Sequence, residues 1–299
     1  MITDMHIHSK SSDGKFPVEE LVKEAAHRNI GFMSITDHDS IDSQEQAVLL
    51  TKKAGIRYVP GVELNVTFSH PEYHEGKQIS LDFLGYQFDL TNEALRDKLD
   101  VVAKYREERA ARILNNLNAE LEKEGLEKLT TNDFKEIEGS VDGVLGRPHI
   151  ADYLVKKKIV GNRQEAFDKY LVKCDAPKYP LYLEEVSRLI RNAGGKLVLA
   201  HPNDPHGTSL GSLTKLLQEQ TQIVQEAMLS YIDGVECWHS RNDAQTTRHY
   251  VKFAKKQGLL MTGGSDCHQK PILMGTVQIP DFVVNLFSVN KIRCHSFLA

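Results

Sequence analysis

The 299-residue sequence predicts an α/β fold, in which strands and helices alternate as in a β/α barrel and a long helical insertion interrupts the alternation. Three observations support this class. Short apolar runs of strand length alternate with segments of helical periodicity in both the first and the last third of the chain. These runs end in polar side chains that can bind metal. The middle of the chain, residues 92–181, shows helical patterns only.

Composition narrows the class further. The chain is 40% hydrophobic and 26% charged, which is typical of a globular protein. Its net charge of −4 argues against binding of long nucleic acid, but it leaves open a small or single-stranded substrate held by a few cations. The four cysteines form no C-x-x-C pair, which indicates reduced thiols. No apolar run approaches the length of a membrane span. We therefore expect a soluble, cytoplasmic protein without a membrane partner. The sequence does not determine its oligomeric state.

The first expected element is a short strand that ends in the polar turn Ser11-Ser12-Asp13-Gly14. His6 and His8 lie two residues apart on it, and such side chains point the same way, so two imidazoles are presented together. This pair is half of a divalent metal site. An ordinary surface strand explains the pair equally well, so the missing ligands must come from elsewhere in the chain.

A predicted helix at 17–29, with Pro17 at its start and acids in its first turn, leads to a strand at 30–36 that ends at Asp37-His38-Asp39-Ser40. Strand, helix and strand make the βαβ unit of a parallel sheet, and the polar cluster again follows the strand's carboxyl end. The next expected elements are a helix at 42–54 and strands at 56–64 and 79–86.

These last two strands each carry a carboxylate among apolar neighbours. Glu63 lies at the end of an apolar run, and Asp82 lies between Leu81 and Phe83. A buried acid needs a partner, so both are candidate ligands. His70 and His74, in the loop between the two strands, are free to reach a site, although exposed loop histidines are more often bystanders.

Helices are expected at 92–124, 131–137, 147–157 and 162–171, and we predict that residues 92–181 form a cap subdomain over the active site. Within this segment, Gly146-Arg-Pro-His-Ile-Ala151 places Arg147 and His149 at a helix start, where an anion binds well. An ion pair between Arg147 and a nearby acid accounts for the arginine equally well.

The barrel pattern resumes at 182. Helices at 182–193, 212–229 and 243–257 lead to strands at 196–200, 232–238 and 259–262, which end at His201, His239 and the segment Asp266-Cys267-His268. In a β/α barrel the carboxyl ends of the strands share one mouth, so distant residues can meet there. The predicted organisation is a barrel of residues 1–91 and 182–285, a cap of residues 92–181 and a tail of residues 286–299.

The strand ends supply eight nitrogen and oxygen donors and a possible ninth: His6, His8, Asp13, His38, Glu63, His201, Asp266 and His268, with Asp82. One ion uses fewer donors and carboxylates can bridge, so we expect two or three divalent ions. A histidine and carboxylate shell without cysteine suits Mn, Fe or Zn. Bridged ions about 3.5–4 Å apart share a hydroxide and clamp a phosphoryl group.

Five ordered motifs over residues 2–280 resemble those of the PHP (polymerase and histidinol phosphatase) family: Asp4-Met-His-Ile-His-Ser9, Thr36-Asp-His-Asp39, Gly61-Val-Glu63, Ala200-His-Pro202 and Gly264-Ser-Asp-Cys-His268. The segment 146–151 resembles the subgroup that contains nucleoside 3',5'-bisphosphate phosphatases and 5'→3' exoribonucleases. The resemblance implies a distorted (β/α)7 barrel with a di- or trinuclear metal site.

The resemblance also implies an assignment of ligands: one metal bound by His6, His8, Glu63 and Asp266, a second by Asp13, His38 and His268, and a third by Glu63 and His201. Arg147 and His149 would bind the substrate phosphate. The chain departs from the subgroup at Asp82, where relatives often carry histidine before an apolar-Leu-Gly-Tyr run. Three outcomes are open for the third site: Asp82 binds a harder metal, His70 or His74 substitutes, or the site is empty.

The leading hypothesis is a metal-dependent phosphoesterase, in which a metal-bridging hydroxide attacks the phosphorus of a small nucleotide or short oligonucleotide. Arg147 would stabilise the developing charge. His239 or His149 would contact the substrate and protonate the leaving alkoxide. The alternatives are a histidinol phosphate phosphatase, an amidohydrolase and a non-catalytic PHP module. An amidohydrolase would lack the ligand-bearing turns at Asp13 and His38.

Overall fold

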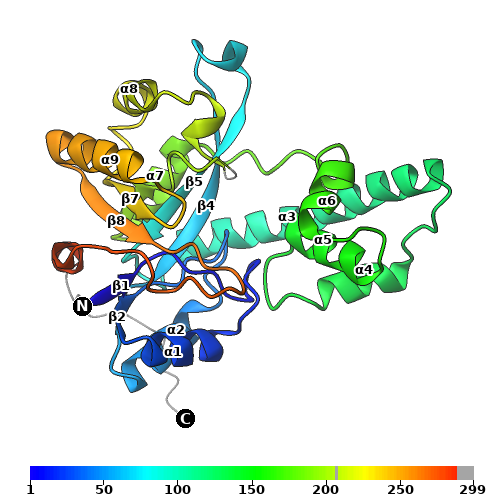
Figure 1. Ribbon diagram of the computed structural model, residues 1–299, viewed down its shortest axis with the longest axis horizontal. Helices are drawn as coiled ribbons and strands as arrows, with labels where there is room; N and C mark the ends of the chain where they lie inside the picture. The colour runs from blue at the N-terminus through cyan, green and yellow to red at the C-terminus, as the bar shows by residue number, and fades with distance from the viewer. Residues whose placement is uncertain (206–207, 288–299) are drawn as a thin grey trace.

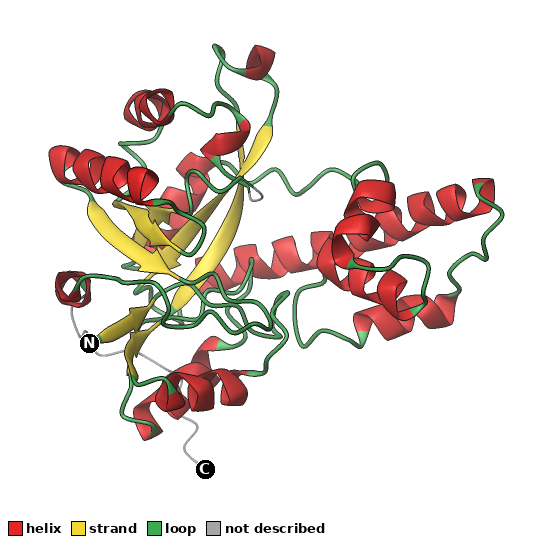
Figure 2. Cartoon of the chain, in the orientation of Figure 1, coloured by secondary structure: helices red, strands yellow, loops and turns green. Residues whose placement is uncertain are grey.

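The computed structural model describes residues 1–205 and 208–287. It has a mixed α/β fold with two adjoining sheets, flanked by helices, and a helical lobe that projects to one side (Figures 1 and 2). The first sheet is parallel and contains β1 (Ile2–Asp4), β2 (Ile30–Met33) and β3 (Arg57–Tyr58). The second has the order β4 (Gly61–Phe68), β5 (Ile79–Tyr86), β6 (Lys196–Leu199), β7 (Gly234–His239) and β8 (Leu260–Gly264).

Strand β5 runs antiparallel to both of its neighbours, β4 and β6, whereas β6, β7 and β8 are parallel. The β/α alternation that the sequence predicts would make neighbouring strands parallel, so the antiparallel β5 departs from that prediction. The reason is the short connection at residues 69–78, which makes a hairpin, whereas a parallel pair needs a crossover of a dozen or more residues. That connection contains only the short helix η1 (His74–Gly76).

Backbone pairing joins the two sheets at both edges. His38 pairs with Glu63 in a parallel bridge, and Ile7 pairs with Cys267 in another. The amide of Met5 donates to the carbonyl of Gly263 at 3.1 Å. These bridges lie just beyond the carboxyl ends of β1, β2 and β8, so the polar segments that follow these strands are brought together.

Among the described residues, five α-helices flank the sheets: α1 (Val18–His27), α2 (Gln44–Lys53), α7 (Leu183–Asn192), α8 (Leu217–Ala227) and α9 (Ala244–Gln257). In α1, for example, Val18, Leu21, Val22 and Ala25 recur at helical spacing and are buried. Most boundaries agree with the sequence prediction to within a few residues. The predicted helix at 212–229 is instead split into η3 (Leu210–Ser212) and α8. The Thr214 hydroxyl accepts the amide of Leu216 at 3.2 Å between them, and so competes with helical pairing.

The helical lobe consists of α3 (Glu93–Lys123), α4 (Thr131–Glu138), α5 (Arg147–Lys156), α6 (Arg163–Ala166) and the π turn η2 (Phe167–Leu171). Its apolar residues, among them Ile113, Leu117, Leu154 and Tyr170, form a buried cluster of their own. The lobe therefore has a core that is separate from the cores that flank the sheets.

The lobe rests directly on the loop that follows β1. The amides of Asp142 and Val144 donate to the carbonyls of Lys10 and Ser11, both at 3.0 Å. Gly143 lies between them, and a Cβ atom there would stand 2.3 Å from the Ser11 carbonyl oxygen, so only glycine fits. This contact ties the lobe to the loop that carries Asp13.

None of the helices in the described part of the chain combines the length and the apolar character that crossing a bilayer requires. The predicted tail at 286–299 lies outside the described residues from 288 onward.

Candidate metal centre

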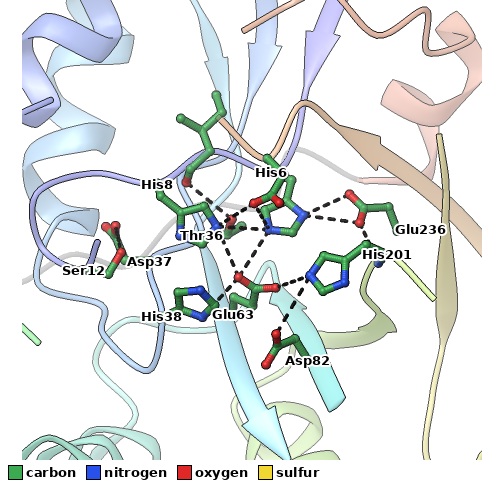
Figure 3. Close-up of polar contacts among 12 residues, drawn as sticks. His6, His8, Ser12, Thr36, Asp37, His38, Glu63, Asp82, His201 and Glu236 are labelled. Carbon is green, nitrogen blue, oxygen red and sulfur yellow. Dashed lines mark hydrogen bonds and ion pairs between the residues drawn. The ribbon is translucent and has the colours of Figure 1, made fainter. Parts of the chain in front are cut away.

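Four buried side chains form the centre of the site: Asp266 after β8, together with His6 and His8 after β1 and Glu63 on β4. Figure 3 shows the last three. The two histidine Nε2 atoms lie 3.1 Å apart. The Nε2 of His8 lies 3.2 Å from both Glu63 Oε2 and Asp266 Oδ1, and the Nε2 of His6 lies 3.3 and 3.4 Å from the same oxygens.

These distances match the shape of a metal shell. Tetrahedral coordination with bonds of about 2.0–2.2 Å puts neighbouring ligand atoms roughly 3.3–3.6 Å apart. The Nε2 atoms of His6 and His8 lie near this spacing from each other and from both carboxylate oxygens. His6, His8 and Glu63 form one group that can hold a metal ion, and His6, Asp266 and His239 form another.

A second group lies beside the first. Asp13 Oδ1 is 3.2 Å from His268 Nε2, and Asp13 Oδ2 is 4.0 Å from His38 Nε2. The ring of His8 stacks on that of His268 with centroids 4.0 Å apart, which joins the two groups. The carbonyl of Asp266 lies 2.9 Å from His268 Nδ1 and can accept its proton, which leaves Nε2 free to bind a cation. This group is partly exposed to the cavity described below.

Glu63 links these donors to a third position. Its Oε2 faces the first group and is 3.2 Å from His38 Nδ1, whereas its Oε1 is 3.0 Å from His201 Nε2. Asp82 Oδ2 lies 4.0 Å from His201 Nε2, and His38, Glu63 and Asp82 together can hold an ion (Figure 3). The two oxygens of Glu63 therefore face different imidazoles. Asp82 reaches the third position.

His70, in the β4–β5 loop, does not explain the third position. His70 lies 3.6 Å from Glu226 of α8, and its Nδ1 accepts the amide of Glu72 at 3.3 Å. His70 is thus held at the outer end of the hairpin. The side chain of His74 lies outside what the structure describes.

His239 contacts the carboxylate of Asp266. Its Nδ1 accepts the amide of Arg241 at 3.2 Å, so the ring proton of a neutral His239 resides on Nε2, which lies 3.5 Å from Asp266 Oδ2. Arg241 contacts the same oxygen at 2.9 Å. These two groups hold Oδ2, so Oδ1 faces His6 and His8. His239 does not line the cavity, and its predicted role as a proton donor to substrate stays a prediction.

Asp37, directly before His38, organises the loop that carries Asp13. Its buried carboxylate accepts four hydrogen bonds, from the Ser9 amide and hydroxyl and from the Ser12 hydroxyl, all at 2.7 Å, and from the Ser43 hydroxyl at 2.6 Å. These four hydrogen bonds use the lone pairs of the carboxylate, so none remains to bind a metal ion. Asp37 therefore supports the ligand loop.

Replacing Asp37 by Asn is expected to destabilise the fold by about 2–4 kcal/mol, because an amide cannot accept from all four donors and leaves some of them unpaired. Urea unfolding with and without added Zn²⁺ measures the loss. Asp42→Asn, which removes the charge from a less buried acid in the same loop, is the matched control. Equal stability of the two variants would contradict this account of the loop.

Without metal, protons balance the charge of the site. Burial alone lowers the pKa of His8, but its hydrogen bonds with Asp266 and Glu63 outweigh burial and raise the pKa to about 10. Burial opposes the cation at His201 as well, yet the bond to Glu63 raises its pKa to about 9. Burial raises the pKa of Glu63, and the neighbouring imidazoles reverse the effect and hold it well below its usual value. His8 and His201 are therefore expected to be protonated at neutral pH when no metal is bound.

Metal loading is therefore expected to release protons. A bound histidine must be neutral, whereas His8 and His201 hold protons up to about pH 10 and 9 in the metal-free protein. The apparent affinity for Zn²⁺ should rise with pH from 6 towards 10. Titration calorimetry at pH 7.5 in two buffers of different ionisation enthalpy measures the released protons, and heats that do not depend on the buffer would contradict the prediction.

A cavity of about 380 Å³ opens beside these donors. Candidate ligands line one side of it, and the lobe and the neighbouring loops supply cations: Arg106, Arg109, Arg147, Lys178 and Arg241. Phe167 of the π turn and Tyr179 add aromatic surface. The cavity therefore joins a metal-binding wall to a cationic wall, an arrangement that suits an anionic substrate.

The arginines of the cavity are all held by carboxylates. Arg106 Nε donates to Asp39 at 2.8 Å, Arg109 and Arg147 both contact Asp175, and Arg241 contacts Asp204. Lys178 differs, since it makes no ion pair among the described residues. Burial lowers the pKa of Lys178 to about 8; the nearby carboxylate of Asp82 opposes this shift, and the guanidinium groups of neighbouring arginines add to it. Lys178 is the cation best placed to receive an anion from solution.

Arg147 pairs with Asp175 at 2.7 Å, as the ion-pair explanation expects. It also lines the cavity, and its predicted role in binding the substrate phosphate stays a prediction. His149 is buried, and its Nδ1 accepts the amide of Gly146 at 3.0 Å, so its ring caps the start of α5. Burial lowers the pKa of His149. His149 does not line the cavity, and its substrate role stays a prediction.

Sequence reasoning missed Lys178, Arg106, Arg241, Glu236 and the supporting role of Asp37. A signal existed for Glu236, because Gly234-Val-Glu236 repeats the tripeptide Gly61-Val-Glu63 on another strand. No such signal marks Lys178, a single lysine in an irregular segment. Its position becomes evident only from the cavity.

Converging histidines and carboxylates beside a cationic cavity define a metal-dependent hydrolase of anionic esters. The PHP domain model matches residues 4–188, and the chain belongs to the PHP family of metal-dependent phosphoesterases. A 5'-3' exoribonuclease of Haemophilus influenzae is 32% identical, over 89% of each chain. A 3',5'-nucleoside bisphosphate phosphatase of Chromobacterium violaceum is 26% identical, over 89% of this chain and 86% of the relative.

A solved structure from Bifidobacterium adolescentis, with the provisional name of metal-dependent phosphoesterase, superposes with a TM-score of 0.79. It is 27% identical, and the match covers 95% of this chain and 94% of the other. The comparisons confirm the predicted family and the predicted reaction class, phosphoric ester hydrolysis.

Proposed function

We propose that this protein hydrolyses a phosphate ester of a small nucleotide, such as a nucleoside 3',5'-bisphosphate, or of the end of a short oligonucleotide. One observation carries the proposal: a cavity of about 380 Å³ is lined both by candidate metal ligands and by Arg147, Lys178 and Arg106. This volume lies in the range of small-molecule sites. A substrate with two phosphates can place one phosphate at the metal ions and the other at these cationic side chains.

The donor set fits two or three divalent ions. In the first group, the Nε2 atoms of His6 and His8 have the spacing of a coordination shell to Glu63 and to Asp266. Asp13, His38 and His268 form a second group. His201 and Asp82 supply donors for a third position. The absence of cysteine from these groups supports Mn, Fe or Zn. When bound, the ions supply an activated water and neutralise charge on the phosphoryl oxygens.

Residues of the chain itself have separate tasks in this proposal. Lys178 and Arg147 bind the phosphate that is not hydrolysed, and Arg147 is kept in position by Asp175. Arg241 and His239 orient Asp266 through Oδ2. The lobe closes one side of the cavity and excludes water from the reacting ester.

We also infer that the strands form the seven-stranded barrel implied by the family resemblance, with residues 92–181 as a cap. Only Val59 and Pro60 separate β3 from β4, so the two count as one bent strand. The bridges from His38 to Glu63 and from Ile7 to Cys267 link the sheets at both edges. The separate apolar cluster of the lobe supports the cap.

A cytoplasmic location is part of the proposal. Cys174, Cys237 and Cys267 are buried free thiols, which suits a reducing compartment.

The test compares three substrates with metal-reconstituted protein: adenosine 3',5'-bisphosphate, a 5'-phosphorylated ribodinucleotide and histidinol phosphate. Inorganic phosphate from the first indicates a bisphosphate phosphatase, and mononucleotide from the second indicates an exonuclease. Both activities agree with the proposal. Turnover of histidinol phosphate alone, or of no substrate by protein that contains metal, would refute it.

A further inference from the structure

We propose that Glu236 is a positioning residue that holds His6 and His201 in the state that metal binding requires. The inference rests on the proposed metal centre but not on the identity of the substrate. Glu236 lies on β7 and its side chain is fully buried. It does not line the cavity, so it contacts neither substrate nor solvent there.

The carboxylate of Glu236 joins two ligand-bearing segments (Figure 3). Its Oε1 and Oε2 atoms lie 3.1 and 3.3 Å from Nδ1 of His6. Oε2 also accepts the backbone amide of His201 at 2.8 Å. One side chain thus connects the segments that follow β1 and β6.

The contact with His6 selects the ring tautomer. A carboxylate only accepts hydrogen bonds, so Nδ1 of His6 must carry a proton, and its Nε2 lone pair is then free. That Nε2 atom faces His8, Glu63 and Asp266, the other donors of the first group. The negative charge of Glu236 also makes the imidazole a stronger donor to a metal.

The contact with His201 holds a strained backbone. His201 has a φ of 21°, which a residue with a side chain rarely adopts. The bond from its amide to Glu236 helps to keep this conformation, which places Nε2 3.0 Å from Glu63. Glu236 therefore holds two proposed metal ligands, His6 through its ring and His201 through its backbone.

The isosteric amide cannot do both tasks. If the carbonyl oxygen of Gln at position 236 accepted the His201 amide, its NH₂ group would face His6 and draw the lone pair of Nδ1 towards it. The proton of a neutral His6 would then move to Nε2 and block metal binding. With the amide reversed, two N–H donors would face each other at His201.

The experiment measures binding of Co²⁺ to Glu236→Gln, using its visible absorption and a competing chelator. We expect affinity for one ion to fall by about 10–100-fold and the absorption of that ion to change. Cys237→Ala is the matched control, because it alters the next residue of β7 without touching His6 or His201, and it should keep the original spectrum. Glu236→Asp keeps the charge on a shorter arm, and should bind more weakly than the unmodified protein.

Unchanged affinity and spectrum in Glu236→Gln would overturn the inference, as would an equal loss in Cys237→Ala. If Glu236→Gln does not fold, unchanged binding by a folded Glu236→Asp would overturn it. Binding that depends on Glu236 in a protein without phosphoesterase activity would overturn the proposed function alone.

Discussion

Replacing Glu63 by Gln is expected to lower kcat/KM for phosphate ester hydrolysis by about 1,000-fold or more, because a bridging carboxylate contributes several kcal/mol through the metals it holds. Glu63 contacts His6 and His8 through Oε2 and His201 through Oε1. Gln keeps the shape but loses the charge and turns one acceptor into a donor. Loss of bound metal should accompany the loss of rate.

Metal content by mass spectrometry and kcat/KM should be measured on the same preparations of Glu63→Gln. Thr67→Val, at the other end of β4, is the control and should keep both values, because no side-chain hydrogen bond of Thr67 is formed among the described residues. A Glu63→Gln protein that keeps its full metal content and a rate within tenfold of the original would contradict the bridging role.

Replacing Lys178 by Met is expected to lower kcat/KM for adenosine 3',5'-bisphosphate by about 100- to 1,000-fold, since a cation that stabilises phosphate in a water-poor site is removed. The unmodified protein should also lose kcat/KM as pH rises through 8. The pKa of Lys178 is lowered to about 8 by burial and nearby guanidinium groups, so its charge is lost above that pH. This alkaline limb should disappear in Lys178→Met.

Two further variants separate charge from packing. Lys178→Arg keeps a cation at all these pH values and should keep part of the activity without the alkaline limb. Lys98→Met removes a lysine that pairs with Glu185 at 2.6 Å outside the cavity lining, and should leave the pH profile unchanged. A value of kcat/KM for Lys178→Met within threefold of the original would show that Lys178 does not bind the phosphate.

Local sequence patterns predicted most of the fold. The strand at 79–86 has the expected boundaries, because its apolar run is flanked on both sides by polar turns. Helix α3 begins at its Asn92 cap, whose side chain accepts the amide of Leu95 at 3.0 Å. Periodicity and caps depend on neighbours in the chain, so they are visible in the sequence. The first strand is shorter than expected and ends at Asp4, because beyond it the segment pairs with residues near 267.

The candidate site was predicted as a set of residues, and not as a geometry. The ends of strands marked His6, His38 and His201, because histidines after apolar runs are conspicuous. Nothing local distinguished Glu236 as a support from Glu63 as a ligand. The two glutamates differ in position: the carboxylate of Glu63 lines the cavity, whereas that of Glu236 contacts His6 behind it.

The sequence by itself determined the kinds of donor atoms, the strands that carry them and the family, since each depends on residue type and short-range order. Only the tertiary structure decided which oxygen of Glu63 meets which imidazole, and that Lys178 lines the same cavity as the candidate ligands. These choices depend on the antiparallel course of β5 and on the seating of Gly143 against Ser11. Both are contacts between distant segments, and their energies do not appear in any local pattern.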